Sequence, residues 1–512
     1  MKGIIINSDV DGILRYIGRD DALPTTVKDI MDFPREFEGT QVTDYFLNVT
    51  EQILNFPSER YQSFLSKYHQ KLENGISVDY SNNVCARAAH IVFEELGVDH
   101  NQIQIDGFRK VGINPWISFR LNDVHDRYMS NGFNIPDFFH EHPEYRRVPP
   151  NTAVRTGYFD HGYDFSHVQV REFTIGMMEE SLERYDPYGI ELDFQRDMYL
   201  FRPGMEYNGV EILNGFVREI DALVHRYEEK YGHEIKFAVR VAPDIQTNFD
   251  FGLDVMQWVR EGIVDMVIPA ARWASNDNDM PIKLWSNMLK PYGVTLAPCI
   301  EMWFAPYPQA KKIWPDITTF AAFAASAYAQ GADKIYLFNY FRDNVHQHFD
   351  KTAPLSFEPD IGPNSLPIMW TVLNTFGDPD AVQKMNRRHI VTYKDVLPAW
   401  ENNGGIGRQL PAVVCGTATF KLFVGDIPDG AELILRLGVK DVEKALTNPP
   451  LVCVNLTTCE FIGSEQDDRF ACSTVLCYSI PKEAHTNMLC PRVAVEELTE
   501  FTWVEIYVKV AD

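Results

Sequence analysis

The ten residues from Tyr188 to Asp197, YGIELDFQRD, carry the pattern that decides the fold. Successive side chains of a β-strand point to opposite faces, so Glu191 and Asp193 share one face and Ile190 and Leu192 share the other. The apolar pair suits packing against helices, whereas the acidic pair suits the inside of a barrel mouth. We therefore predict a strand over 189–193 that ends in polar residues.

Seven further short apolar runs end in the same way, and long amphipathic segments separate them. The runs are Lys2–Asn7, Thr43–Asn48, Trp116–Leu121, Lys236–Val241, Asp265–Pro269, Val294–Ile300 and Lys334–Asn339. Helical patterns between them include Ala86–Leu96, Val168–Tyr185, Gly215–Tyr231, Leu253–Glu261 and Phe320–Ala329. This alternation is typical of βαβ units. It predicts an α/β fold with a closed (β/α)₈ TIM barrel, because the first strand runs into NSDVDG and not into the glycine-rich turn of a doubly wound sheet.

The pattern changes towards the C-terminus. Helical stretches are expected around 366–374 and 380–393, and a turn-forming cluster, NNGG, follows at Asn402–Gly405. Short β-rich runs separated by turn residues come after it, from Thr417–Val424 to Phe501–Val510. We predict two domains, a catalytic barrel with terminal helices over 1–400 and an all-β sandwich over 401–512.

Composition narrows the range of partners. The 512 residues carry a net charge of −25, and a surface of that sign repels nucleic acid and anionic membrane surfaces. The apolar run near the start is too short for a signal peptide or a membrane span, so we expect a cytoplasmic protein. The eight cysteines form no CxxC pair or Cys/His cluster and are interpreted as mostly buried thiols. Neither a metal nor a cofactor is expected.

Polar residues stand at nearly every predicted strand end, which is where a TIM barrel builds its active site. They are Asp9, Asp11, Asn48, Arg120, Asn122, Asp123, His125, Glu191, Asp193, Arg196, Arg240, Asp244, Arg272, Trp273, Glu301, Trp303, Asn339 and Asp343. Acidic side chains beside tryptophans suit carbohydrate, and glycosidases need one group to protonate the leaving oxygen and another to activate water or attack. The sequence therefore predicts a glycoside hydrolase.

Several of these residues allow two interpretations. A buried Arg120 must face either a ligand or a neighbouring carboxylate. His125 is either an ordinary loop histidine or a base whose basicity Asp123 raises. Glu191 and Asp193 either act on a sugar or form structural ion pairs with nearby arginines.

One family resemblance extends this reasoning. The segment Ser166–Asp197 is similar to the helix-then-strand block of barrel glycoside hydrolases. The RLNDVH motif of Arg120 to His125, with an aspartate after the first strand, Arg196 and Asn339, resembles glycoside hydrolase family 156. That family consists of inverting exo-sialidases with a C-terminal β-sandwich. The resemblance implies release of terminal sialic acid from glycoconjugates, and a homodimer.

The resemblance also implies roles for single residues. His125 would activate the attacking water, with Asp9 or Asp11 as its catalytic partner. Arg120 and Arg196 would bind the sialic acid carboxylate, for which a guanidinium is better suited than an ammonium group. The remaining predicted sugar-binding residues are Asn339, Asn122, Asp123, Glu191 and Asp193. A neutral histidine base also avoids the repulsion that an anionic nucleophile would meet near that carboxylate.

Two alternatives remain open. The first is a barrel glycosidase that acts on a neutral sugar, with Glu191 or Asp193 paired with Glu301 as its carboxylates. The second is a non-catalytic barrel that only binds carbohydrate.

Overall fold

The structure is a computed structural model. It describes residues 3–9, 12–19, 24–78, 80–124, 127, 135–149, 158–272, 276–301, 303–339, 347–358, 365–393, 409–466 and 474–510. Within these residues no helix is both long and apolar enough to cross a bilayer.

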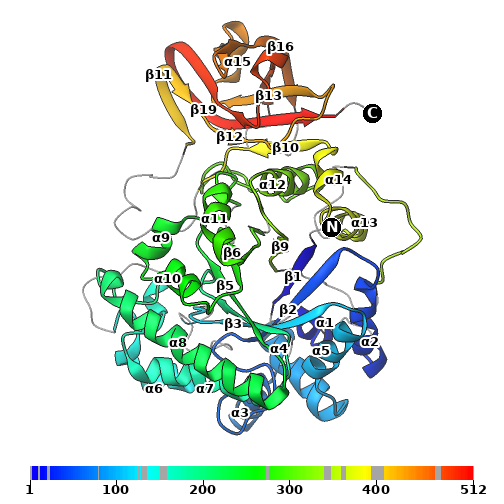
Figure 1. The fold of residues 1–512 in the computed structure, drawn as a ribbon, viewed down its shortest axis with the longest axis vertical. Helices are drawn as coiled ribbons and strands as arrows, with labels where there is room; N and C mark the ends of the chain where they lie inside the picture. Colours follow the sequence, from blue (N-terminus) through cyan, green and yellow to red (C-terminus); the bar gives the residue numbers. More distant parts are fainter. Residues whose placement is uncertain are drawn as a thin grey trace.

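A parallel sheet curls into the barrel at the centre of the larger lobe (Figure 1). Its strands are β1 (Ile4–Ser8), β2 (Val42–Thr50), β3 (Asn114–Arg120), β4 (Gly189–Asp193), β5 (Lys236–Val241), β6 (Met266–Pro269), β7 (Thr295–Leu296), β8 (Cys299–Ile300) and β9 (Ile335–Leu337). Each of the eight predicted runs overlaps one of these strands, and the run Val294–Ile300 contains both β7 and β8.

The barrel closes through β7 and β8, which are two halves of one extended segment. β7 pairs with β6, β8 pairs with β9, and β9 pairs with β1, all in parallel. Cys299 of β8 also bridges Ala270, the residue after β6. Pro298 lies between the halves, and because proline has no N–H to donate, the ladder is interrupted there. The predicted (β/α)₈ barrel is confirmed.

Helices surround this sheet. They are α1 (Gly12–Ile17), α2 (Val27–Asp32), α3 (Phe64–Glu73), α4 (Tyr80–His90), α5 (His100–Lys110), α6 (Asp137–Glu141), α7 (Val168–Arg184), α8 (Glu206–Tyr231), α9 (Ile245–Asp250), α10 (Val255–Arg260), α11 (Ile282–Leu289), α12 (Ile317–Ala329), α13 (Leu366–Thr375) and α14 (Pro379–Gln383). Ile190 and Leu192 of β4 lie in one buried cluster with Leu182 of α7 and Phe216 of α8, as the alternation in the sequence predicts.

The inside of the barrel is apolar towards the start of the strands and charged towards their carboxyl ends. Phe46 stacks on Trp116 with ring centroids 4.7 Å apart, and Tyr336 packs edge-on against Phe46 at 5.4 Å. Four residues beyond Trp116, Arg120 pairs in register with Asp193. The aromatic layer therefore forms the floor beneath the charged side chains.

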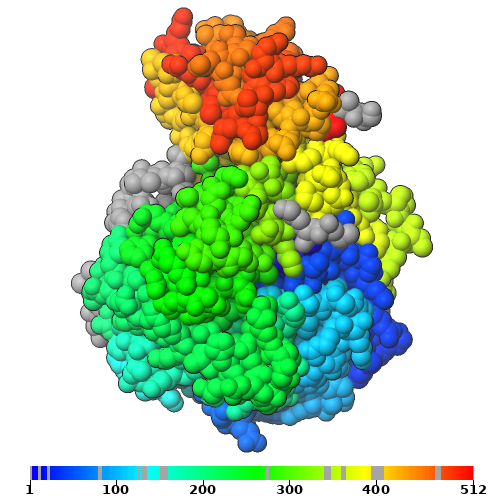
Figure 2. Space-filling view, viewed as in Figure 1, coloured from blue at the N-terminus to red at the C-terminus, as the bar shows by residue number. Residues whose placement is uncertain are grey.

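The C-terminal part is an antiparallel all-β domain with its own core, which forms a separate lobe on the barrel (Figure 2). Its strands are β10 (Arg387–Ile390), β11 (Ala412–Thr419), β12 (Leu422–Phe423), β13 (Glu432–Val439), β14 (Leu451–Val454), β15 (Thr457–Thr458), β16 (Glu460–Gln466), β17 (Thr474–Ser479), β18 (Met488–Leu489) and β19 (Pro491–Lys509), with the short helix α15 (Val442–Thr447). The long strand β19 pairs with β10, β11, β13 and β14. An all-β C-terminal domain was predicted and is confirmed.

One predicted helix is wrong in its second half. The segment 380–393 is helical only as far as Gln383, and its later residues form β10, which pairs with the far end of the chain. Long-range strand pairing overrides local helical periodicity here. The predicted domain boundary at residue 400 falls in 394–408, outside the described residues, and stays a prediction.

The cysteines are only partly as expected. Cys85, Cys299, Cys459 and Cys477 are buried free thiols, whereas Cys415 is exposed. Cys453 and Cys490 are partly buried, and Cys472 lies outside the described residues.

A buried ion-pair network links three strands of the β domain and reaches the barrel through Asp316. Arg388 of β10 donates two hydrogen bonds, of 3.1 and 2.9 Å, to Glu505 of β19 and lies 3.4 Å from Asp316 at the start of α12. Arg436 of β13 donates a 2.9 Å bond to the same glutamate. Burial raises the pKa of Glu505, but the two guanidinium groups outweigh it and hold the pKa below its ordinary value.

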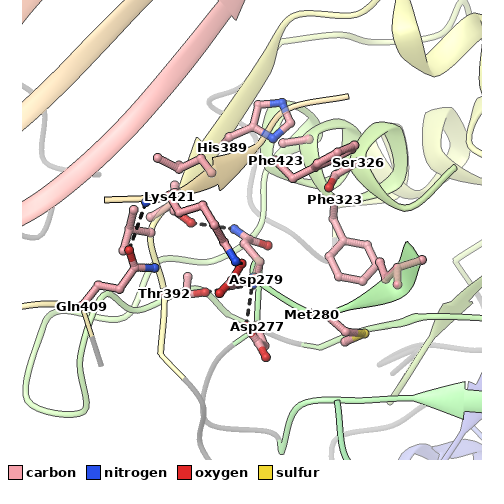
Figure 3. Close-up of a pocket in the computed structure, with 16 residues that line it drawn as sticks. Asp277, Asp279, Met280, Phe323, Ser326, His389, Thr392, Gln409, Lys421 and Phe423 are labelled. Atoms are coloured by element: carbon pink, nitrogen blue, oxygen red, sulfur yellow. Dashed lines mark hydrogen bonds and ion pairs between the residues drawn. The ribbon is translucent and has the colours of Figure 1, made fainter. Parts of the chain in front are cut away.

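The junction also encloses a small cavity (Figure 3). Its volume is about 20 Å³, which is enough for about one water molecule. Lys421 lies 2.7 Å from Asp279 across the junction, and Asn278 bonds to Thr392. Burial lowers the pKa of His389 in its wall well below the ordinary value, so this histidine is neutral. The cavity belongs to the domain junction and is too small for a sugar.

Glu505→Gln is predicted to lower the free energy of unfolding by about 3 kcal/mol, because it leaves buried guanidinium charge uncompensated. Glu432→Gln is the matched control, since Glu432 pairs with Lys509 at an exposed site and the change should cost below about 0.5 kcal/mol. Urea unfolding at pH 7 measures both. The native pKa of Glu505 is lowered, so its contribution is lost as the pH falls through that native value. Equal losses in the two variants would contradict the junction role.

Candidate active site

Arg120, the last residue of β3, is the centre of a buried ion-pair network. Its Nη2 lies 2.8 Å from Asp9 Oδ1 and 3.2 Å from Asn339 Oδ1. Its Nη1 lies 2.5 Å from Glu51 Oε1 and 3.3 Å from Asp123 Oδ2. These five residues, here called the Arg120 network, come from the carboxyl ends of β1, β2, β3 and β9. They therefore meet at the edge of the barrel where active sites lie.

Glu51 was not among the predicted residues. Burial raises its pKa, the neighbouring carboxylate of Asp9 raises it further, and Arg120 only partly offsets both, so the pKa lies well above the ordinary value. Glu51 and Asp9 also share a hydrogen bond. Two carboxyl groups this close repel each other when both are ionised, which favours the protonated form of Glu51. The missed signal is the acidic residue directly after Thr50, where β2 ends two residues beyond its predicted limit.

The turn after β2 explains why Glu51 points at Arg120. Asn48 accepts a 3.1 Å bond from the backbone N–H of Thr50, and the Thr50 hydroxyl accepts one of 3.2 Å from the N–H of Gln52. Gln52 has a φ of 78° and donates side-chain bonds to the carbonyls of Arg120 and Leu121. The ends of β2 and β3 are thereby locked together around the ion pair.

Arg196 extends the Arg120 network towards β4. Its Nε lies 3.4 Å from Asp123 Oδ2, so Asp123 lies between two guanidinium groups. The next residue, Asp197, accepts a bond from the N–H of Val124 and lies 3.3 Å from Arg272. The loops after β3 and β4 are therefore held against each other by charge.

The side chain of Asn122 forms hydrogen bonds with backbone groups of two neighbouring loops. Its amide nitrogen donates to the carbonyls of Tyr163 and Tyr199 at 3.1 and 3.0 Å, and its oxygen accepts from the N–H of Tyr163 at 2.8 Å. The side chain is thus committed to backbone groups and fixes the neighbouring loops. Its predicted contact with substrate stays untested.

A second buried group, the Arg240 network, consists of Arg240, Asp193 and Glu301. Arg240 Nη1 lies 2.9 and 3.1 Å from the two oxygens of Asp193, and its Nη2 lies 2.5 Å from Glu301. The guanidinium carbon lies 3.5 Å from the ring centroid of Phe338, and that of Arg120 lies 5.6 Å from the same ring. Asp193 thus forms an ion pair with Arg240, which is one of the two interpretations that the sequence allowed for it.

Glu191 lies between the aromatic floor and these charges. Ser118 Oγ is 2.5 Å from its Oε2, and the Tyr336 hydroxyl donates a 2.8 Å bond to its Oε1. Burial, reinforced by the charge of Asp193, raises the pKa of Glu191 to about 8. Glu191 is therefore mainly protonated at neutral pH.

Negative groups are in excess at this end of the barrel. Among the described residues, seven carboxyl groups lie with four guanidinium groups in the contacts above. The carboxyl groups are Asp9, Glu51, Asp123, Glu191, Asp193, Asp197 and Glu301, and the guanidinium groups are Arg120, Arg196, Arg240 and Arg272. Uncompensated buried charge is costly, which agrees with the raised pKa values of Glu51 and Glu191.

Four predicted mouth residues lie outside the described part of the chain: His125, Asp11, Trp273 and Asp343. The described residues contain no cluster of three or more histidine, cysteine or acidic side chains arranged to hold a metal ion.

Comparisons with known proteins give distant likenesses only. No family model and no curated protein matches the sequence. Among solved structures, the chain is similar to an α-L-fucosidase from Paenibacillus thiaminolyticus, with 11% identity, 97% of this chain and 96% of that chain covered, and a TM-score of 0.34. A Bacteroides thetaiotaomicron α-L-fucosidase gives 10% identity, coverage of 96% and 91%, and a TM-score of 0.36. A maltogenic α-amylase from Thermotoga neapolitana gives 11% identity, coverage of 98% of this chain and 98% of that chain, and a TM-score of 0.36. Such distant likenesses do not assign this chain to a family, and membership of family 156 stays a prediction.

Glu191→Gln is predicted to flatten the pH dependence of stability. The folded-state pKa of about 8 lies above the ordinary 4.5, so the folded state binds the extra proton between these values. Stability in the wild type therefore falls as the pH rises from about 5 to about 8. Glutamine cannot ionise, so the variant should lose roughly 1–4 kcal/mol less over that range. Urea unfolding at pH 5.5, 7 and 8.5 measures this, and parallel profiles would contradict a raised pKa.

Proposed function

We propose that this protein is a glycoside hydrolase whose chemistry takes place at the Arg120 network. The observation that carries the proposal is the pair formed by Asp9 and Glu51, which both contact Arg120 at the carboxyl edge of the barrel, where burial and the neighbouring Asp9 raise the pKa of Glu51. Glycoside cleavage needs a group that protonates the leaving oxygen and a group that takes a proton from water. Two neighbouring carboxyl groups, one of them with a raised pKa, supply the titratable groups for such transfers.

Arg120 and Asn339 keep this pair in place. The guanidinium group contacts both carboxyl groups and so limits their movement. Asn339 adopts a left-handed backbone conformation with φ 52°, and its side-chain oxygen accepts from Arg120. Residues in such conformations are concentrated at functional sites, where the surrounding structure maintains them. His125, expected to activate water, follows Asp123 by two residues.

For the substrate, the charges favour a neutral sugar. Both terminal nitrogens of Arg120 contact protein carboxylates, and those of Arg240 do the same. A further carboxylate from a substrate would have to displace one of these contacts. The other carboxylate pairing expected for a neutral-sugar enzyme, Glu191 or Asp193 with Glu301, would instead move the chemistry to the Arg240 network, where burial and Asp193 raise the pKa of Glu191.

An inverting exo-sialidase is the second candidate. It is supported by the second guanidinium, because Arg196 adjoins Arg120 through the shared Asp123. Reorientation of Asp123 would present two arginines to one carboxylate, which is the recognition that a sialoside requires. The resemblance to family 156 supports the same candidate.

A panel of glycosides tests the proposal. Nitrophenyl fucosides, glucosides and galactosides and a fluorogenic sialoside are offered to the wild type, to Asp9→Asn and to Asp333→Asn. Asp333 precedes β9 at the opposite end of the barrel, so its variant is a matched control. We expect Asp9→Asn to lower kcat/KM by about 100-fold or more and the control to stay near the wild type. Hydrolysis that survives Asp9→Asn intact would place the chemistry elsewhere.

Arg196→Lys separates the two substrate classes. Loss of a two-pronged charged contact should lower sialoside turnover by roughly 10-fold or more, because such a bond contributes about 1.5–3 kcal/mol. Neutral glycosides should change by much less. If sialoside kinetics are unaffected, Arg196 does not bind a substrate carboxylate.

A further inference from the structure

Trp314 is an exposed tryptophan on the loop that begins at Glu301 of the Arg240 network. Its side chain is 46% exposed, in contrast to Trp116, Trp258 and Trp285, which are at most 2% exposed. The residue lies in the connection between β8 and α12, which starts at the carboxyl edge of the barrel. Its ring is thus open to solvent on the loop that follows Glu301.

The local backbone holds this ring in a fixed position. Phe304 and Ile313 form an antiparallel bridge with two backbone hydrogen bonds of 2.8 and 2.9 Å, and both side chains are buried. Their neighbours Trp303 and Trp314 therefore stand opposite each other on the other face. The two rings pack edge to face with centroids 4.6 Å apart, and Lys312 Nζ lies 4.7 Å from the centroid of Trp303.

The same loop is anchored to the candidate catalytic carboxylates. The side chain of Asn276 accepts a 2.6 Å bond from the N–H of Glu301 and donates to the carbonyls of Glu301 and Trp303. Glu301 in turn contacts Arg240 at 2.5 Å. Trp303 of the tryptophan pair therefore follows Glu301 of the Arg240 network by two residues in the sequence.

We propose that Trp314 is a stacking platform for the sugar ring next to the one that is cleaved off. This inference rests on the proposed function and specifies its substrate as a disaccharide or longer glycan. The C–H face of a pyranose packs well on an indole ring, and the ring of Trp314 is held by Trp303, over which Lys312 lies in turn. The exposed side of Trp314 is the surface that such a ring would cover.

The choice of a sugar over a protein partner follows from the surroundings. The loop that carries Trp314 begins at Glu301, which pairs with Arg240, and the exposed residues of its own hairpin include the charged Lys311 and Lys312. A protein interface would need an extended apolar area around the ring.

The kinetic test compares Trp314→Ala, Trp314→Phe and Tyr292→Ala. Tyr292 is 50% exposed and precedes β7 at the opposite end of the barrel, so its variant controls for loss of an exposed aromatic ring. The substrates are a disaccharide and the methyl glycoside of the same terminal sugar. For Trp314→Ala we expect kcat/KM to fall about 10-fold on the disaccharide and to stay within about twofold on the methyl glycoside. Trp314→Phe should retain most activity. Equal effects on both substrates, or no effect, would overturn the platform.

A binding measurement separates this inference from the proposed function. Tryptophan fluorescence is titrated with lactose, cellobiose, fucosyllactose and sialyllactose in the wild type and in Trp314→Ala. A signal for one of these sugars that weakens about 10-fold in the variant supports the platform, even in a protein that hydrolyses none of the panel. Binding that is independent of Trp314, or no binding by any of the four sugars, would refute it.

Discussion

The charge balance around Arg120 is the constraint on which the rest of the site depends. A guanidinium group with no solvent exposure at the end of a barrel strand is tolerated only if carboxylates surround it, and Asp9, Glu51 and Asp123 do so. Burial of Glu51 and the repulsion among these carboxylates then raise its pKa well above the ordinary value. The same ion pairs that make the buried arginine possible therefore create a titratable group at the barrel edge.

Barrel closure converts this local balance into a site. β1 and β9, which contribute Asp9 and Asn339, meet only because the interrupted strand β7–β8 completes the ring. The aromatic floor of Phe46, Trp116 and Tyr336 keeps the charged layer at the carboxyl ends of the strands. The β domain contacts the barrel through Arg388, which lies 3.4 Å from Asp316 at the start of α12.

Most of the barrel strands and many of the polar residues at their ends could be predicted from the sequence, because hydrophobic periodicity is a local property of the chain. The limits of β4 and β5 agree with the predicted runs, and polar residues at strand ends correctly brought Asp9, Arg120, Asp123, Arg196 and Asn339 together. Glu51 was missed because β2 continues beyond its apolar run and a turn with positive φ redirects the chain. β10 was missed because its partner lies more than a hundred residues away. Whether Arg120 would face a ligand or a carboxylate depended on the three-dimensional partners, which periodicity does not encode.

The most direct test of the central claim is a crystal structure of Asp9→Asn with the glycoside that the wild type hydrolyses. Our account predicts an intact glycoside whose terminal sugar contacts the Arg120 network, with the scissile oxygen within hydrogen-bonding distance of residue 9 or Glu51. A glycoside bound away from the carboxyl ends of β1, β3 and β9, with the Arg120 network unaltered and out of contact, would contradict it.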